Sequence, residues 1–107
     1  MTNERVRGNL DLMLLQILAG GVSHGYAVVC ELRERSAGAF DLPEGTVYPA
    51  LHRLERQGLL QSTWDLSGPR RRRLYALSRA GRTALRAERR EWDRFVGAVG
   101  AVLGSPA

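Results

Sequence analysis

The sequence contains no lysine, one cysteine and only two histidines, and these scarcities exclude several kinds of site. Cys30 stands alone, so the chain can form neither an internal disulfide nor a cysteine-based metal cluster. His24 and His52 are far apart and do not show the spacing of metal ligands. No Ser-His-Asp order and no phosphate-binding loop is present either. We therefore expect that the protein is not an enzyme and that it binds neither a metal nor a cofactor.

Long hydrophobic runs are also missing. The most apolar stretch, LDLMLLQILAG at 10–20, is interrupted by Asp11 and Gln16 and is too short to span a bilayer. The start of the chain does not resemble a signal peptide. These features predict a cytoplasmic protein that does not associate with a membrane.

Arginine supplies all sixteen basic residues against eleven acidic ones, which gives a formal net charge of +5. This usage has two compatible explanations. It is typical of a GC-rich genome, and it also suits a polyanionic partner, because the planar guanidinium matches phosphate. The length of 107 residues and the 44% hydrophobic content predict one folded unit with a modest core.

Hydrophobic spacing predicts two helices before residue 40. The first covers 9–21, with Asn9 as its cap and two glycines at its end, and it is apolar on almost every side. One small core cannot cover that surface, so we expect part of this helix to meet another subunit. The second covers 23–38, with Ser23 as its cap. Its predicted buried stripe consists of Tyr26, Val29, Cys30 and Leu32.

A third helix is predicted in GTVYPALHRLERQGLL at 45–60, although it contains Pro49. Val47, Leu51 and Leu54 share its buried face. Pro49 is tolerated if it lies in the first turn, where an N–H has no partner within the helix. The remaining surface carries side chains suited to phosphates and base edges, namely Thr46, Tyr48, Pro49, His52, Arg53 and Arg56. The alternative is that Tyr48 only packs against neighbouring strands and Pro49 only starts the helix.

After Gly58 the hydrophobic pattern alternates. LLQSTWDL at 59–66 and RRRLYALS at 71–78 predict two strands, joined by the turn SGPR. The resulting β-hairpin carries four arginines at its tip and on the returning strand: Arg70, Arg71, Arg72 and Arg73. Alternation places Arg71 and Arg73 on one side of the strand and the other two on the opposite side. A charge run is often only a solvated surface, but beside an arginine-bearing helix this one indicates contact with nucleic acid.

A long final helix is predicted from about residue 78 or 79 to about residue 103, with Ser78 as its cap. Two series of residues seven apart lie along it: Leu85, Trp92 and Val99, and Glu88, Phe95 and Val102. Together they form a heptad seam with one polar position, which is typical of helices that pair between subunits.

Three helices followed by a hairpin are the elements of a winged helix-turn-helix, a mainly α fold with a small β-hairpin (α+β). In that fold the third helix enters the DNA major groove and the hairpin lies along the backbone or in the minor groove. We expect a winged helix-turn-helix DNA-binding domain at 1–78 and a dimerisation helix at 79–107.

With these elements placed, the chain resembles the PadR family of bacterial transcriptional regulators, in the short form with a single C-terminal helix. The resemblance extends from about residue 8 to about residue 103. It is carried by HGYAVVCEL at 24–32, GTVYPALHRLERQGLL at 45–60, the tryptophan at 64, RRRRLYALSRAGR at 70–82 and EW at 91–92.

The resemblance implies a homodimeric repressor of a pseudo-palindromic operator in double-stranded DNA. It implies DNA contacts from Tyr26, from Thr46, Tyr48, Pro49, His52 and Arg53, and from the hairpin arginines. The helices at the two ends of the chain would form the subunit interface, through Leu10, Leu14, Leu85, Trp92, Phe95, Val99 and Val102. Trp92 matches an interface tryptophan that lines a ligand pore in some members, which makes a small aromatic effector a candidate ligand.

The alternative function is a winged-helix protein–protein interaction module without direct DNA readout. Such a module needs an apolar or acidic surface on the third helix. His52, Arg53 and Arg56 favour nucleic acid instead.

Overall fold

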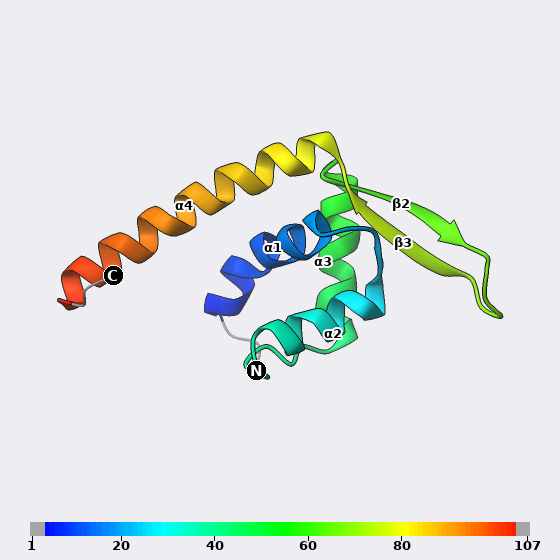
Figure 1. Ribbon diagram of the computed structural model, residues 1–107, viewed down its shortest axis with the longest axis horizontal. Coiled ribbons are helices and arrows are strands. Elements are labelled where there is room, and N and C mark those ends of the chain that lie inside the picture. The colour runs from blue at the N-terminus through cyan, green and yellow to red at the C-terminus, as the bar shows by residue number, and fades with distance from the viewer. Residues whose placement is uncertain (1–3, 105–107) are drawn as a thin grey trace.

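The computed structural model describes residues 4–104 and contains four helices and one small sheet (Figure 1). The elements follow in the order α1 (Glu4–Ala19), β1 (Ser23–His24), α2 (Gly25–Arg35), α3 (Glu44–Arg56), β2 (Leu60–Asp65), β3 (Arg72–Leu77) and α4 (Arg79–Leu103). The sheet is antiparallel with strand order β1-β3-β2. This arrangement confirms the predicted mainly α winged helix-turn-helix with a long C-terminal helix.

The core lies where α1, α2 and α3 pack against one another and against β3. The predicted apolar face of α3 is confirmed, because Val47, Leu51 and Leu54 are each at most 1% exposed. Tyr75 and Leu77 of β3 are also buried. The β2–β3 hairpin and the far half of α4 extend from this three-helix body in opposite directions (Figure 1). No helix within residues 4–104 combines the length and the apolar character needed to cross a membrane.

The start of α1 differs from the prediction. The helix begins at Glu4, and Asn9 lies inside it, where its side-chain amide donates to the carbonyl of Arg5 at 2.7 Å. The prediction of Asn9 as a cap is therefore wrong. Asparagine and the glycine before it are weak helix formers, but burial of Val6 and Leu10 on either side favours the helix at this point. The end of α1, at Ala19, agrees with the predicted glycine stop.

The start of α2 also differs. Ser23 is not a cap, because it pairs with Tyr75 of β3 as part of the two-residue strand β1. Such a short strand shows no alternation that a sequence pattern could reveal. Tyr26 is 58% exposed, so its assignment to the buried stripe is wrong, and Cys30 is half-buried. The stripe consists of Val28, Val29 and Leu32.

Pro49 lies in the second turn of α3 and not in the first as predicted, because the helix begins at Glu44. The proline therefore removes one hydrogen bond from the helix interior, a change that costs about 3 kcal/mol in an isolated helix. Ala50 and Leu51, directly after it, are both buried. Tertiary packing on that face offsets the missing bond and keeps the helix continuous.

The start of α4 is joined closely to the segment that follows α3. The hydroxyl of Ser78 accepts the N–H of Gly81 at 3.0 Å, which confirms the predicted cap, and it donates to the carbonyl of Gly58 at 2.7 Å. A Cβ at Gly81 would lie 2.1 Å from the carbonyl oxygen of Leu59. Position 81 must therefore be glycine for the two backbones to approach this closely.

Gly81→Ala should destabilise the protein by about 1–3 kcal/mol or more, because an added methyl group meets backbone that cannot rotate away. Gly97→Ala is the matched control, since it lies in the same helix with nothing within 4 Å of the added Cβ. This control should be neutral or stabilising by up to about 1 kcal/mol. Urea unfolding measures both, and equal effects would contradict the close contact.

Candidate nucleic-acid interface

α3 presents two flanks beside its buried face. Tyr48, His52 and Glu55 lie toward the sheet, where Glu55 accepts hydrogen bonds from Ser62 and Arg73. The other flank lies toward α1 and carries Thr46, Pro49 and Arg53. The predicted contact residues of α3 are therefore divided between two neighbours.

The sheet-side hollow has a volume of about 300 Å³ and brings together residues from several elements. Tyr26 of α2 and Tyr48 and His52 of α3 line it together with two hairpin arginines, Arg72 and Arg73. The remaining lining residues are His24, Gly25, Trp64 and Tyr75. Residues as far apart in the sequence as His24 and Tyr75 thus share one concave, basic and aromatic surface.

Gly25 makes room for Tyr48 in this hollow. A Cβ at position 25 would lie 2.9 Å from the Cε1 atom of Tyr48, so a larger residue would displace the ring. The Tyr48 hydroxyl donates to Glu44 at 3.4 Å. Partial burial, with Glu44 nearby, raises the pKa of Tyr48, so at neutral pH the hydroxyl keeps its proton and can donate.

Trp64 positions two of the hairpin arginines. The guanidinium carbons of Arg71 and Arg73 lie 4.7 Å and 4.6 Å from its ring centroid. Such cation–π contacts are worth about 0.5–1 kcal/mol at exposed sites. Arg72 points to the other side of the strand, where its Nη2 lies 3.8 Å from Asp65. The predicted alternation of the arginines is confirmed at these three positions, and Arg70 is exposed in the turn.

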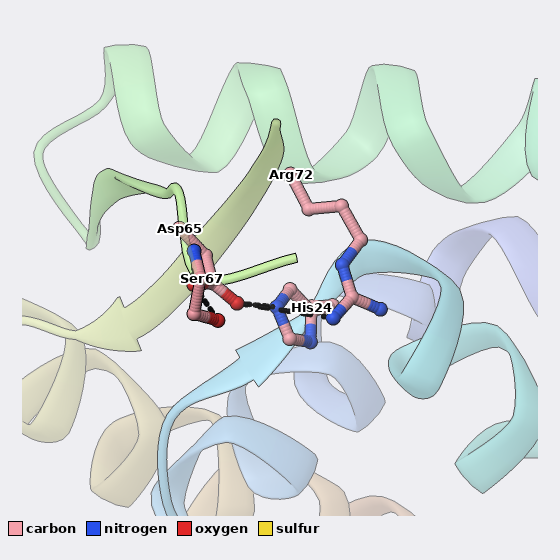
Figure 2. A network of polar contacts seen from close by, with 4 residues as sticks. All are labelled: His24, Asp65, Ser67 and Arg72. Carbon is pink, nitrogen blue, oxygen red and sulfur yellow. Dashed lines mark hydrogen bonds and ion pairs between the residues drawn. The ribbon is translucent and has the colours of Figure 1, made fainter. Parts of the chain in front are cut away.

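A polar network joins the hairpin to the body of the protein (Figure 2). The Nε2 atom of His24 lies 2.8 Å from Oδ2 of Asp65, which links β1 to the end of β2. The backbone N–H and the hydroxyl of Ser67 both donate to Oδ1 of Asp65, at 3.0 Å and 2.6 Å. The hydrogen bonds from Ser67, together with the one from His24, hold the pKa of Asp65 well below its usual range. The sequence offers no signal for this network, because β1 itself is not predictable.

On the opposite flank of α3, Arg53 is paired with Asp11 of α1. Its Nη1 and Nη2 atoms donate to the two carboxylate oxygens at 2.8 Å and 2.7 Å. These hydrogen bonds raise the pKa of the guanidinium. Both side chains are about 40% exposed, so the pair contributes at most about 1 kcal/mol to stability. Arg53 and Arg56 were both predicted to contact DNA. Arg53 is paired with Asp11, whereas Arg56 is exposed and unpaired in the described residues.

The predicted interface residues separate into buried and exposed groups. Leu10, Leu14 and Leu85 lie in the core of the chain itself, so they offer little surface to a partner. The second group forms an exposed apolar stripe on α4: Trp92 (41% exposed), Phe95 (62%), Val96 (41%), Val99 (40%) and Val102 (87%).

A hollow of about 370 Å³ lies next to this stripe, between α1, α2 and α4. Trp92, Arg35 and Arg89 line it together with apolar side chains such as Met13 and Phe40. The indole of Trp92 therefore borders both a concave surface and the exposed stripe.

Comparisons with known proteins agree on a family of transcriptional regulators. A model of the transcriptional regulator PadR-like family matches residues 14–87. The transcriptional regulator Rv3488 of Mycobacterium tuberculosis is 39% identical over 89 residues, which cover 83% of this chain and 80% of that protein.

Solved structures agree. A PadR family transcriptional regulator from Eggerthella lenta superposes with a TM-score of 0.84 and 34% identity, covering 94% of this chain and 86% of that one. Bacillus subtilis PadR in complex with operator DNA has a TM-score of 0.67 and 22% identity, and the match covers 73% of this chain and 45% of that one. At 22% identity, the similarity to Bacillus subtilis PadR concerns the fold alone.

Asp65→Asn should lower the melting temperature at neutral pH, because asparagine lacks the charge that faces His24 and Arg72. The native pKa of Asp65 lies below that of an unfolded aspartate, about 3.9. The stabilisation is therefore complete above that value and is lost as the pH falls toward the native pKa. The difference between wild type and variant should shrink below about pH 4.

Thermal unfolding followed by circular dichroism at several pH values measures this difference. Asp93→Asn is the control, because Asp93 is exposed on α4 and unpaired in the described residues. A difference for Asp65→Asn that stays constant as the solution is acidified would contradict the assigned network.

Proposed function

Because the chain belongs to the PadR-like family of transcriptional regulators, whose members are not enzymes, we propose that it represses transcription by binding a pseudo-palindromic DNA operator as a homodimer. The observation that carries the proposal is the sheet-side hollow. Its lining includes Tyr26 of α2, Tyr48 and His52 of α3, and Arg72 and Arg73 of the hairpin. The operator complex of Bacillus subtilis PadR supports the proposal because that protein has the same fold.

In this proposal α3 enters the major groove and the hairpin follows the backbone, as in other winged helices. Two copies of α3 would occupy successive major grooves about 34 Å apart, which is one turn of the duplex. The hairpin arginines Arg70, Arg71, Arg72 and Arg73 would neutralise phosphates, although only some of them can do so in one complex, because Arg71 and Arg73 point away from Arg72. Trp64 already holds Arg71 and Arg73, so less side-chain freedom would be lost on binding.

The α3 residues would meet the DNA in different ways. Thr46 and Tyr48 would offer hydroxyl groups to the groove, His52 would offer its imidazole, and Pro49 would add a rigid apolar contact. Arg53 can act while it is paired, because Asp11 takes one hydrogen from each terminal nitrogen and leaves the other N–H groups of the guanidinium available. Asp11 would then orient Arg53 toward a guanine. Arg56, one turn later, would contact phosphate.

The dimer would form through α4, so that residues 1–78 bind DNA and residues 79–107 join the subunits. Support comes from the exposed stripe, in which Phe95, Val99 and Val102 lie on one side of a helix that extends away from the core (Figure 1). An exposed apolar stripe of this length is unusual on a monomer and typical of a pairing helix.

A small aromatic effector would bind at the hollow beside Trp92. The volume of about 370 Å³ falls within the range of small-molecule sites, and the mixture of apolar side chains with Arg35 and Arg89 suits a planar ligand that carries an acceptor. Such a ligand would release the operator only if it bound one dimer geometry more tightly than the other.

DNA binding is tested with a duplex that the protein selects from a random-sequence pool. Arg53→Ala should weaken binding to this duplex by about 1–3 kcal/mol and relax the preference at one base pair. Arg72→Ala should weaken binding to all duplexes alike and reduce the dependence of affinity on salt. Gel shifts at several salt concentrations measure both effects.

Arg90→Ala, on α4, is the control that removes the same charge away from the proposed interface. Unchanged binding in both interface variants would refute the residue assignment. Failure of the wild type to retain any duplex in dilute buffer would favour the protein-interaction module instead.

Dimerisation is tested by placing a charge in the stripe. Phe95→Glu should convert the dimer to a monomer at micromolar concentration, because the buried carboxylate would lack a partner. Arg90→Glu introduces the same side chain elsewhere on α4 and should leave the dimer intact. Light scattering after gel filtration gives both masses, and a wild-type protein that is already monomeric would reject the proposed assembly.

A further inference from the structure

A second hollow lies on the flank of α3 that faces α1, opposite the hairpin. It has a volume of about 430 Å³, and we call it the α1-side hollow. Arg7 of α1 lines it together with Arg53 and Arg56 of α3. Thr46 and Pro49, two of the residues expected to face DNA, line it as well. The hollow therefore continues the surface that the proposed function assigns to the operator.

The charges in this hollow are incompletely balanced. Asp11 pairs with Arg53, but Arg7 and Arg56 are exposed and have no ion-pair partner within residues 4–104. Leu10 and Ala50, which also line the hollow, are buried, so the hollow rests on packed core. Two helices thus bring unpaired guanidinium groups to one concave surface. A bound anion would supply the missing negative charge.

Arg5 shows the contrasting arrangement. It lies two residues earlier on the same helix, but it lines a different hollow between α1 and α4. That hollow also contains the carboxylates of Glu4, Glu88 and Glu91. The surroundings of Arg5 therefore suit an ordinary solvated arginine near acidic groups, whereas those of Arg7 do not.

The dimensions of DNA indicate which anion fits the α1-side hollow. A helix with its side chains is about 10–12 Å across, and the major groove is about 12 Å wide. A helix in that groove therefore has a sugar-phosphate backbone along each flank. For α3, one flank is next to the arginine-bearing hairpin and the other is next to the α1-side hollow.

We propose that the α1-side hollow binds a phosphate of the DNA backbone and that Arg7 of α1 makes this contact. The inference rests on the proposed function and extends it to a helix that the sequence had assigned only to the core and the subunit interface. Arg7 and Arg56 would grip one backbone while Arg72 and its neighbours grip the other. Base readout by Thr46 and Arg53 would take place between the two.

The test compares Arg7→Ala with Arg5→Ala, two variants that remove the same charge two residues apart in the first turn of α1. A phosphate contact contributes about 0.9 to the slope of log affinity against log salt concentration. Arg7→Ala should therefore reduce that slope by about one, and it should weaken a selected duplex and a mixed-sequence duplex by the same factor. Arg5→Ala should leave the slope unchanged. Arg7→Gln, which keeps a long polar side chain, should behave like Arg7→Ala and serves if the alanine variant is poorly folded.

The outcomes separate this inference from the function beneath it. If the wild type binds DNA but the Arg7 variants keep its salt slope, or change it only as much as Arg5→Ala does, the contact is refuted and the proposed function stands. If the wild type binds no duplex, both are refuted. Arg7→Lys provides a further check, because it retains the charge and should restore most of the slope.

Discussion

The burial of one face of α3 is the constraint on which the other features depend. Val47, Leu51 and Leu54 have almost no exposed surface, so α3 cannot rotate about its axis without exposing them to water. This fixed rotation turns Tyr48 and His52 toward the sheet and Arg53 toward α1. The packing of the same face also keeps the helix continuous through Pro49. Apolar packing thus determines where the polar side chains of α3 point.

The structure positions its arginines before any partner is present. Arg71 and Arg73 lie against Trp64, Arg72 lies near Asp65, and Arg53 is paired with Asp11. Each of these contacts is weak alone, because the groups are partly exposed. Together they restrict long side chains that otherwise lose much freedom when they bind. Within the described residues, the same surface keeps Arg7 and Arg56 free of ion pairs.

Much of the fold could be predicted from the sequence, because long amphipathic segments such as α3 and α4 show clear periodicity. The errors lie where a local signal competes with packing. Asparagine is a common helix cap, yet the burial of Val6 and Leu10 on either side of Asn9 keeps this residue inside α1. The strand β1 is too short to show a pattern, and the contact between His24 and Asp65 joins residues 41 positions apart. The pairing of Asp11 with Arg53 is equally non-local. The family motifs named the candidate contact residues but could not reveal how α1 and the sheet divide them.

The close contact between Gly81 and Leu59 fixes the start of α4 to the segment that follows α3. The first turn of α4 is bonded to the segment directly after α3, through Ser78 and the carbonyl of Gly58. The 25 residues of α4, at about 1.5 Å each, then form a lever roughly 37 Å long. A tilt of only about 5° at its pivot would displace the far end by about 3 Å, given that length. In the proposed dimer, the angle at which the two α4 helices cross would set the distance between the two α3 helices. That distance would decide whether both α3 helices match the pitch of the DNA duplex.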